Sequence, residues 1–202
     1  MKLFFSIFLF CATIVKAQTI NVTDYGAQPN SFADATEAVQ KAIEACRSQQ
    51  KSIIIFPEGR YDFWPDKAVE TKYYITNTSS EEEVPEKKQR VGLYFKKLNN
   101  ITLEGNNAHF VFHGKMIIWV IDSCENIRIQ NVSVNYERPG MSEMTIKEIT
   151  PGSVIAAVHP DSKFAIINNR LEWYGEKWVA RNFHAVLVRP SEDILLYSSW
   201  TP

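Results

Sequence analysis

The sequence predicts a mostly β protein: a parallel β-helix with an N-terminal capping helix and an inserted small antiparallel β subdomain. Three observations lead to this fold class. Short strand patterns recur at a constant offset, one amphipathic helix precedes the first long apolar strand, and a hairpin pattern with a Pro-Gly turn interrupts the series. We expect coils of the β-helix over residues 18–138, the antiparallel subdomain over 139–182 and a truncated continuation of the coils over 183–202.

Length and composition fit a packed globular protein. The 202 residues are 45% hydrophobic and 12% aromatic, which is enough apolar material for a core. The 22 Lys and Arg residues against 23 Asp and Glu give a formal charge of −1, so no basic surface for nucleic acid is expected. The sequence contains no run of about 20 apolar residues, the length that a membrane-spanning helix needs.

The N-terminal segment, 1–17, has the composition of a secretory signal peptide. Lys2 precedes an apolar run, and Val15-Lys16-Ala17 resembles the end of a cleavage site. The pattern predicts export to the periplasm or the extracellular space. After cleavage we expect no stable membrane insertion.

An amphipathic helix is predicted to begin near Asp34, after a short strand around Ile20. Asp34 is a hydrogen-bond acceptor followed three residues later by Glu37, the spacing of a capping box. Apolar residues then recur on one helical face, at Ala35, Ala38, Val39, Ala42, Ile43 and Cys46. The next run, residues 52–56, is apolar at consecutive positions, which predicts a strand buried on both faces with the helix lying over it.

The central segment contains a weak internal repeat. Residues 92–106 align with 118–132, each unit being an apolar strand, a polar turn with Asn and an alternating strand. The aligned pairs are Phe95 with Ile121, Leu98 with Cys124, Asn100 with Asn126, Ile101 with Ile127 and Leu103 with Ile129. The leucine pattern of leucine-rich repeats is absent, so a parallel β-helix fits better. Cys124 is then expected to point into the core, and Asn100 and Asn126 to stack at a turn.

Two stretches interrupt these coils. Residues 62–90 are polar and predict a solvated surface loop. Residues 145–158 predict a hairpin around a Pro-Gly turn, and 163–174 continue as strand. Three aromatic residues follow or end this stretch, and they fit either the core of an inserted barrel, which we favour, or a surface on which sugars stack: Trp173, Tyr174 and Trp178.

The end of the sequence carries no pattern that closes a solenoid. Stacked coils need about three or more repeats and a cap at each end. Only about three coils precede the hairpin segment, and no amphipathic helix follows before Pro202. We expect the reading frame of a longer parent protein to continue past Pro202.

Several motifs resemble those of known enzymes. The N-terminal motifs resemble those of pectin-lyase-like right-handed parallel β-helices: Asp24-Tyr25-Gly26-Ala27, Asp34-Ala35-Thr36 and Ile55-Phe56-Pro57-Glu58-Gly59-Arg60-Tyr61. Later motifs resemble those of the α-1,3-galactosidases of glycoside hydrolase family 110: Arg90-Val91-Gly92-Leu93, Leu103-Glu104-Gly105-Asn106, Phe112-His113-Gly114-Lys115-Met116 and Asn135-Tyr136-Glu137-Arg138-Pro139. The likeness runs from about Ile20 to Pro202 and implies an N-terminal fragment of such an enzyme.

The resemblance implies an exo-glycosidase that hydrolyses terminal α-1,3-linked galactose from oligosaccharides or glycoconjugates such as the blood-group B antigen. It also implies inversion at the anomeric carbon, with no metal and no cofactor. Inversion needs an acid and a base carboxylate roughly 6.5–9.5 Å apart. No motif of this chain matches the catalytic carboxylates, which we expect beyond Pro202, so the chain alone is expected to be inactive.

Few residues of the chain are candidates for direct chemistry. Glu137 and Arg138 follow a coil strand and are weak candidates for substrate binding, although a local ion pair or loop anchor explains them as well. His109 and His113 are four residues apart, but the strand pattern between them argues against a metal pair. Cys46 and Cys124 have the spacing of neither a disulfide framework nor a metal site, so we expect buried free thiols.

Two other functions fit the same architecture. A pectin-type polysaccharide lyase or polygalacturonase is the first, although a lyase needs a calcium-binding acidic cluster that does not stand out here. A non-catalytic β-helix that binds glycans is the second, and it predicts sugar binding without turnover.

Overall fold

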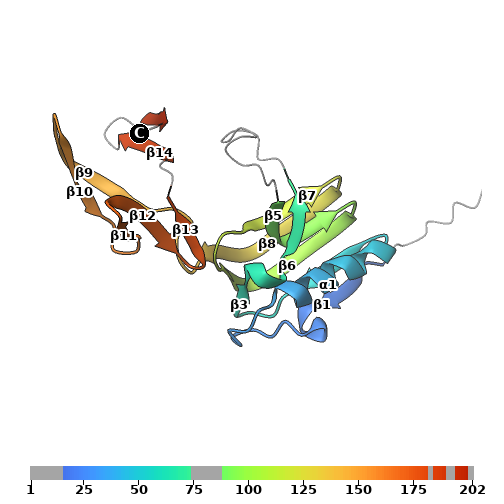
Figure 1. Cartoon of the computed structure of the whole chain (residues 1–202). Coiled ribbons are helices and arrows are strands. Elements are labelled where there is room, and N and C mark those ends of the chain that lie inside the picture. The colour runs from blue at the N-terminus through green and yellow to red at the C-terminus, as the bar shows by residue number, and fades with distance from the viewer. Residues whose placement is uncertain (1–15, 74–87, 182–183, 190–193, 200–202) are drawn as a thin grey trace, which may run out of the picture.

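The computed structural model describes residues 16–73, 88–181, 184–189 and 194–199. The predicted signal peptide falls almost wholly in residues 1–15, outside these ranges. The described residues are mostly β-strand, with one α-helix, α1 (Thr36–Ala45). The strands fall into two groups, parallel sheets in the first part of the chain and antiparallel sheets in the second (Figure 1).

Two sheets built on parallel pairs make up the first part. The first has the order β1-β2-β6-β3, with β8 on the other edge of β6, and all of its pairs are parallel. The second has the order β4-β5-β7, in which β5 and β7 are parallel and β4 is antiparallel to β5. Their bounds are β1 Gln18–Asn21, β2 Ser52–Ile55, β3 Arg60–Phe63, β4 Val69–Lys72, β5 Lys88–Lys96, β6 Asn99–Phe112, β7 Ile117–Asp122 and β8 Glu125–Tyr136.

The register of the parallel pairs is the one expected from the sequence. Ile101 pairs with Ile127 in β6 and β8, and Phe95 pairs with Ile121 in β5 and β7, so the β5–β7 ladder and the β6–β8 ladder as far as Glu104 keep the offset of the sequence repeat. The predicted asparagine stack is also confirmed, since the amide of Asn126 donates to the side-chain oxygen of Asn100 at 2.9 Å.

The helix packs against the common core with the predicted face inward, and it contacts β1 of the first sheet and β5 of the second. Val39, Ala42, Ile43 and Cys46 are buried, and Cys124 is half-buried against the same core; both thiols are free. The predicted capping box is wrong, because the N-cap residue of the helix is Ala35, which has no side-chain cap, and Asp34 lies one residue before it. The Asp34 carboxylate accepts from the Thr36 backbone N–H at 2.9 Å, but Glu37 forms an ion pair with Lys41 instead of returning to the backbone. This i,i+4 pair competes successfully because Lys41 lies one turn along the same helical face.

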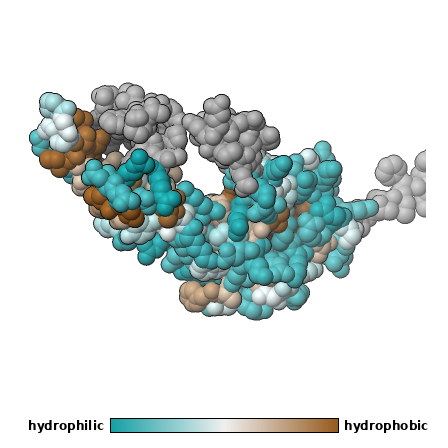
Figure 2. All heavy atoms as spheres, in the orientation of Figure 1, coloured by the Kyte–Doolittle hydropathy of each residue, from teal (hydrophilic) through white to brown (hydrophobic). Residues whose placement is uncertain are grey.

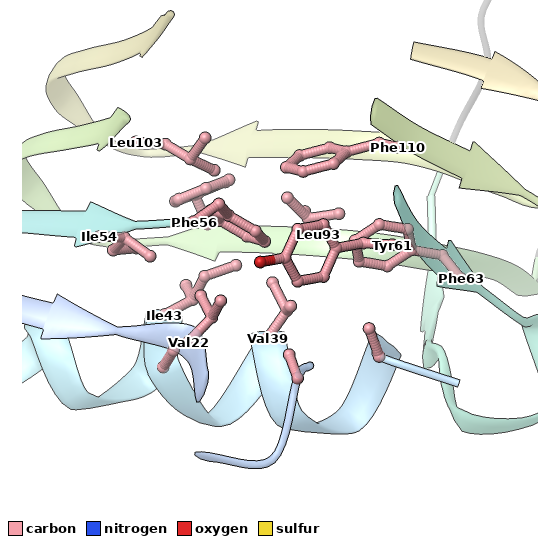
Figure 3. Close-up of a cluster of buried hydrophobic side chains, with 14 of the residues drawn as sticks. Val22, Val39, Ile43, Ile54, Phe56, Tyr61, Phe63, Leu93, Leu103 and Phe110 are labelled. Atoms are coloured by element: carbon pink, nitrogen blue, oxygen red, sulfur yellow. The ribbon is translucent and has the colours of Figure 1, made fainter. Parts of the chain in front are cut away.

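Aromatic rings fill the space between the helix and the parallel strands. Phe110 lies at the centre, with ring centroids of Phe56 at 4.7 Å and Phe63 at 5.2 Å (Figure 3). Phe63 also stacks on Phe112 at 4.7 Å, and all four rings are fully buried. Burial of this apolar surface is the main stabilising contribution to this part of the chain.

The second part of the chain forms small antiparallel sheets. Their bounds are β9 Met144–Thr150, β10 Ser153–Val158, β11 Lys163–Ile167, β12 Arg170–Gly175, β13 Trp178–Ala180, β14 His184–Arg189 and β15 Ile194–Ser199. The predicted hairpin is confirmed, because β9 and β10 pair across Pro151-Gly152. The prediction of a barrel in this region is wrong for residues 144–180. The two-stranded sheet of β9 and β10 and the three-stranded sheet of β11, β12 and β13 do not pair with each other.

The antiparallel sheets bury little of their apolar surface. Trp173 is buried and contacts Phe164 edge-on at 5.8 Å, whereas Tyr174 is exposed. Large apolar side chains remain exposed on both sheets, including Ile149, Val154, Ile166 and Val179. Brown patches lie over these sheets in Figure 2. Only Trp173 of the three predicted core aromatics is therefore in a core position.

The prediction of a solvated loop over residues 62–90 is wrong at both ends of this segment. Asp62 lies in β3 and is buried. Its burial is possible because Arg60 and His113 bond to its carboxylate. Residues 69–72 form β4, whose backbone groups pair with β5. Residues 74–87 lie outside the described ranges. In the part of the chain that the structure covers, no helix has the length and apolar character needed to cross a membrane.

Gly105 marks the point where the register of β6 and β8 changes, and its replacement is expected to destabilise this pair. Glu104 pairs with Gln130 but Ala108 pairs with Val132, so the offset between the strands becomes shorter across this glycine. A Cβ at Gly105 would lie 2.4 Å from the backbone oxygen of Asn131 and 2.2 Å from a methyl of Val132. Because a backbone oxygen of a paired strand cannot move aside, we expect Gly105→Ala to lower the free energy of unfolding by about 2–3 kcal/mol.

Gly140→Ala is the matched control for this measurement by urea denaturation. No atom lies within 4 Å of the position that its Cβ would take. We expect this variant to unfold within about 0.5 kcal/mol of the wild type. Equal unfolding midpoints for the two variants would contradict the close approach at Gly105.

Candidate functional site

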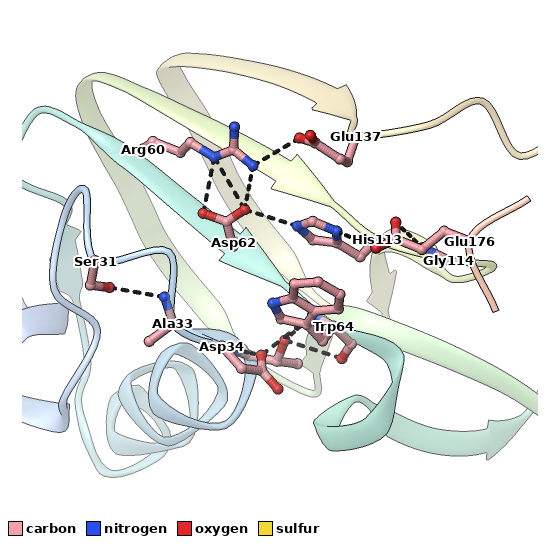
Figure 4. Close-up of polar contacts among 11 residues, drawn as sticks. Ser31, Ala33, Asp34, Arg60, Asp62, Trp64, His113, Gly114, Glu137 and Glu176 are labelled. Atoms are coloured by element: carbon pink, nitrogen blue, oxygen red, sulfur yellow. Dashed lines mark hydrogen bonds and ion pairs between the residues drawn. The ribbon is translucent and has the colours of Figure 1, made fainter. Parts of the chain in front are cut away.

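Charged side chains gather where β3, β6 and β8 end. The strands are parallel, so their C-terminal ends lie at the same edge of the sheet. The backbone N–H of His113 donates to Phe63 O, and that of Glu137 donates to Phe112 O, both at 2.9 Å. These bonds fix the residues that follow each strand. We call the resulting set of side chains the end cluster: Arg60, Asp62, His113, Glu137 and Glu176 (Figure 4).

Asp62 is the centre of the end cluster. Its side chain is 2% exposed and accepts hydrogen bonds from Arg60 Nε and Nη2 at 2.6–3.1 Å. Nε2 of His113 lies 2.8 Å from the same carboxylate. Burial alone would raise the pKa of Asp62, but the hydrogen bonds from Arg60 and His113 outweigh it and lower the pKa. Asp62 is therefore an ionised, fully occupied acceptor at neutral pH.

His113 joins two carboxylates. Its Nδ1 lies 2.8 Å from Glu176 Oε1, and the Gly114 N–H donates to the other oxygen of Glu176 at 3.2 Å. Each ring nitrogen of His113 thus lies within hydrogen-bonding distance of a carboxylate oxygen, so the ring links β3 to the turn that carries Glu176. The indole of Trp64 covers one face of this ring, with centroids 3.5 Å apart and planes at 8°.

The end cluster connects the two parts of the chain. Glu176 lies in the turn between β12 and β13, 63 residues from His113 in the sequence. Lys177, in the same turn, forms an ion pair with Asp66. Lys115 lies 4.5 Å from the ring centroid of Trp178, a cation–π contact. Together these contacts hold the three-stranded antiparallel sheet against the end of the parallel strands.

The arrangement limits the chemistry that the cluster can perform. Asp62 is buried and saturated with donors, so it is not available as a general acid or base. Glu137 is the most exposed of the cluster carboxylates at 45%, and Arg60 Nη2 donates to it at 2.8 Å. A carboxylate in this position is suited to accept a hydrogen bond from a hydroxyl group of a ligand. The end cluster thus connects the two parts of the chain, and Glu137 is its one accessible hydrogen-bond acceptor.

The structure separates the two residues that the sequence pairs as candidates. Glu137 lies in the end cluster, where the ion pair considered as its alternative role is present. Arg138 is exposed and makes no hydrogen bond or ion pair with the other described residues. A role of either residue in substrate binding stays a prediction, as does the position of the catalytic carboxylates beyond Pro202.

The two histidines contact different partners. His109 Nδ1 lies 2.8 Å from the hydroxyl of Ser133, whereas His113 bonds to Asp62 and Glu176. No three His, Cys, Asp or Glu side chains are grouped for a metal ion within the described ranges. Sequence reasoning missed Asp62 and Glu176. The alternation Arg60-x-Asp62 within a strand is an available signal for the first, because it places both side chains on one face.

Comparison with known proteins adds a second kind of evidence. The family "Rhamnogalacturonase A/epimerase, pectate lyase-like" matches residues 19–77. The chain is 37% identical over 193 residues to alpha-1,3-galactosidase A of Bacteroides fragilis, covering 95% of this chain and 32% of the relative. It is 32% identical to alpha-1,3-galactosidase B of Bacteroides thetaiotaomicron, over 95% of this chain and 31% of the relative. The chain thus spans about a third of the length of the curated relatives that it matches.

Proposed function

The chain is related over 95% of its length to bacterial α-1,3-galactosidases, and we propose that it forms the N-terminal part of an exported glycosidase that removes terminal α-1,3-linked galactose from glycans. The observation that carries this proposal is the 37% identity with the Bacteroides fragilis enzyme, which extends through both the parallel and the antiparallel sheets. Export rests on the signal-peptide pattern of residues 1–17. The substrate is an oligosaccharide or glycoconjugate, such as the blood-group B antigen.

The proposed architecture is a right-handed parallel β-helix over residues 18–138. Two ladders of parallel strands, β5 with β7 and the first part of β6 with β8, share one offset along the sequence, as successive coils of a single solenoid would. The pectate lyase-like match over residues 19–77 supports the same fold. In this proposal α1 caps the first coil, residues 139–182 are an insertion between coils, and residues 183–202 continue the coils.

The proposed reaction is inverting hydrolysis without a metal or cofactor. It needs an acid and a base carboxylate on opposite sides of the scissile bond, separated by the attacking water. Asp62 is buried and paired, so it supplies neither group. We assign the two catalytic carboxylates to residues outside this chain and give Glu137 and Arg138 the role of contacting the substrate. A chain of this length alone is then inactive.

Galactose release by a chimeric enzyme tests the proposal. Residues 18–202 of this chain would replace the aligned third of the Bacteroides fragilis α-1,3-galactosidase A, and release of galactose from Galα1-3Gal would be measured with EDTA present. We expect the chimera to be active, while residues 18–202 alone release no galactose. The unmodified Bacteroides enzyme is the positive control.

Each other outcome corrects a definite part of the proposal. Turnover by residues 18–202 alone would place the catalytic groups within this chain. A folded chimera with no activity on galactosides would overturn the family function. Cleavage of rhamnogalacturonan by the chimera would favour the pectin-type alternative, which the match over residues 19–77 supports independently.

A further inference from the structure

A concave surface lies on the outer face of the first parallel sheet. Ile101 and Leu103 point into the core, so Thr102 between them points outward from β6. Arg128 of β8 pairs in register with Thr102, which places the two side chains next to each other, about 4.8 Å apart along the ladder. Lys51, just before β2, and Asn126, near the start of β8, complete the walls of a cavity of about 600 Å³.

The cavity presents positive charge without a matching carboxylate. The side chains of Lys51 and Arg128 are exposed and make no hydrogen bond or ion pair with the other residues that the structure describes. No acidic side chain lines the cavity. Glu104 lies two residues after Thr102 on the same face of β6. Its carboxylate accepts hydrogen bonds from the side-chain amides of Gln130 at 2.6 Å and Asn131 at 2.8 Å, so these neighbours already bind it.

The polar wall of the cavity is ordered before any ligand binds. The Asn126 amide donates to Asn100 Oδ1 at 2.9 Å, and the Asn100 amide donates to Gln50 O at 3.0 Å. This ladder fixes both amides while the Asn126 side-chain oxygen remains without a partner among the described residues. The Thr102 hydroxyl likewise has no hydrogen-bond partner among them. The cavity therefore combines two unpaired cations with groups that can bind hydroxyls.

We propose that this cavity binds the carboxylate of an acidic oligosaccharide. The planar guanidinium of Arg128 can bind a carboxylate through two parallel hydrogen bonds, and Lys51 adds a second positive charge. The amides of Asn100 and Asn126 and the Thr102 hydroxyl match the hydroxyl groups of the sugar ring. This goes beyond the proposed galactosidase activity, whose terminal galactose is neutral. The carboxylate can come from a uronic acid or from a sialic acid, which present the same group.

Calorimetric titration of the intact chain tests the site with three probes. These are a galacturonic acid trisaccharide, 3′-sialyllactose and neutral Galα1-3Gal. We expect one acidic probe to bind at least about tenfold more tightly than the neutral sugar, and the probe that binds identifies the source of the carboxylate. Because charge-assisted hydrogen bonds carry the interaction, affinity is expected to fall as salt is added.

Variants separate this cavity from a general effect of charge. Arg128→Gln is expected to weaken binding of the acidic probe about tenfold, and Lys51→Gln by a smaller factor. Arg170→Gln removes the same charge from an exposed position of β12 and is expected to leave binding unchanged. Circular dichroism would confirm that all three variants fold. Equal binding of acidic and neutral probes, or unchanged binding by Arg128→Gln, would overturn the proposal, and neither result bears on galactose release.

Discussion

Replacing Asp62 with asparagine is expected to lower the free energy of unfolding by about 3 kcal/mol. The carboxylate is 2% exposed and bonds to both Arg60 and His113, so the variant removes the buried anion that these two side chains share. Removing one partner of a buried ion pair costs about 3–5 kcal/mol. We expect the lower end of this range because Glu137 still accepts from Arg60 and Glu176 still accepts from His113.

Asp66→Asn is the matched control, since it changes the same functional group four residues away. Asp66 pairs with Lys177 and Arg90, but its side chain is 60% exposed. Exposed ion pairs contribute at most about 1 kcal/mol, so urea denaturation should show only a small loss for this variant. A loss for Asp62→Asn as small as that for Asp66→Asn would show that the end cluster does not stabilise the fold.

Acid should reduce the difference between the wild type and Asp62→Asn. Burial opposes ionisation of Asp62, but the bonds from Arg60 and His113 prevail and lower its pKa below the unfolded value of about 3.9. The folded state therefore favours the ionised form. The resulting stabilisation is complete above the unfolded pKa and disappears as the pH falls through the folded pKa. Below about pH 4, the wild type should lose stability more steeply than the variant; parallel curves would exclude Asp62 as the responsible group.

The features that can be predicted from the sequence depend on repeating or local patterns. The pairing of Ile101 with Ile127 follows from alternating apolar residues, because a slip of one residue would turn the whole apolar set to solvent. The buried face of α1 follows from the helical period of its apolar residues for the same reason. Both predictions need only short stretches of sequence and no knowledge of distant partners.

The end cluster cannot be predicted because its members are far apart in the sequence. His113 lies 51 residues from Asp62 and 63 from Glu176, and no local pattern indicates which acidic residue will meet it. Glu137 is indicated by its position after a strand, but its partner Arg60 is 77 residues away. Sheet topology brings these side chains together, and periodicity alone does not provide the strand order.

The antiparallel region shows the same limit at the level of packing. The hairpin of β9 and β10 is predictable, since the turn residues and the alternation lie within one short segment. Closure into a barrel depends instead on contacts between separate sheets. Phe164 and Trp173 contact each other within one sheet, and their contact joins no second sheet. Apolar residues such as Ile149 and Ile166 remain exposed.

Phe110→Ala is expected to have the largest effect on stability, a loss of about 3–5 kcal/mol. The ring is fully buried and lies within 4.7–6.1 Å of the ring centroids of Phe56, Tyr61 and Phe63. Truncation removes its transfer free energy and leaves a cavity among side chains held by parallel strands, which can collapse only in part. Phe110→Leu keeps most of the volume and should cost much less, because it leaves a far smaller cavity.

Phe164→Ala tests whether the effect arises from burial rather than from loss of a phenyl ring. Phe164 is 44% exposed and contacts Trp173 alone among the aromatic rings of the described residues, so we expect a much smaller loss for it. Hydrogen exchange would locate each effect. Phe110→Ala should reduce protection in β2, β3, β6 and β8, whereas Phe164→Ala should reduce it in β11 and β12. We expect the parallel and antiparallel parts to unfold separately, because only the few contacts around the end cluster connect them. Similar losses of protection in both regions for both variants would contradict this and mean that the two parts unfold as one cooperative unit.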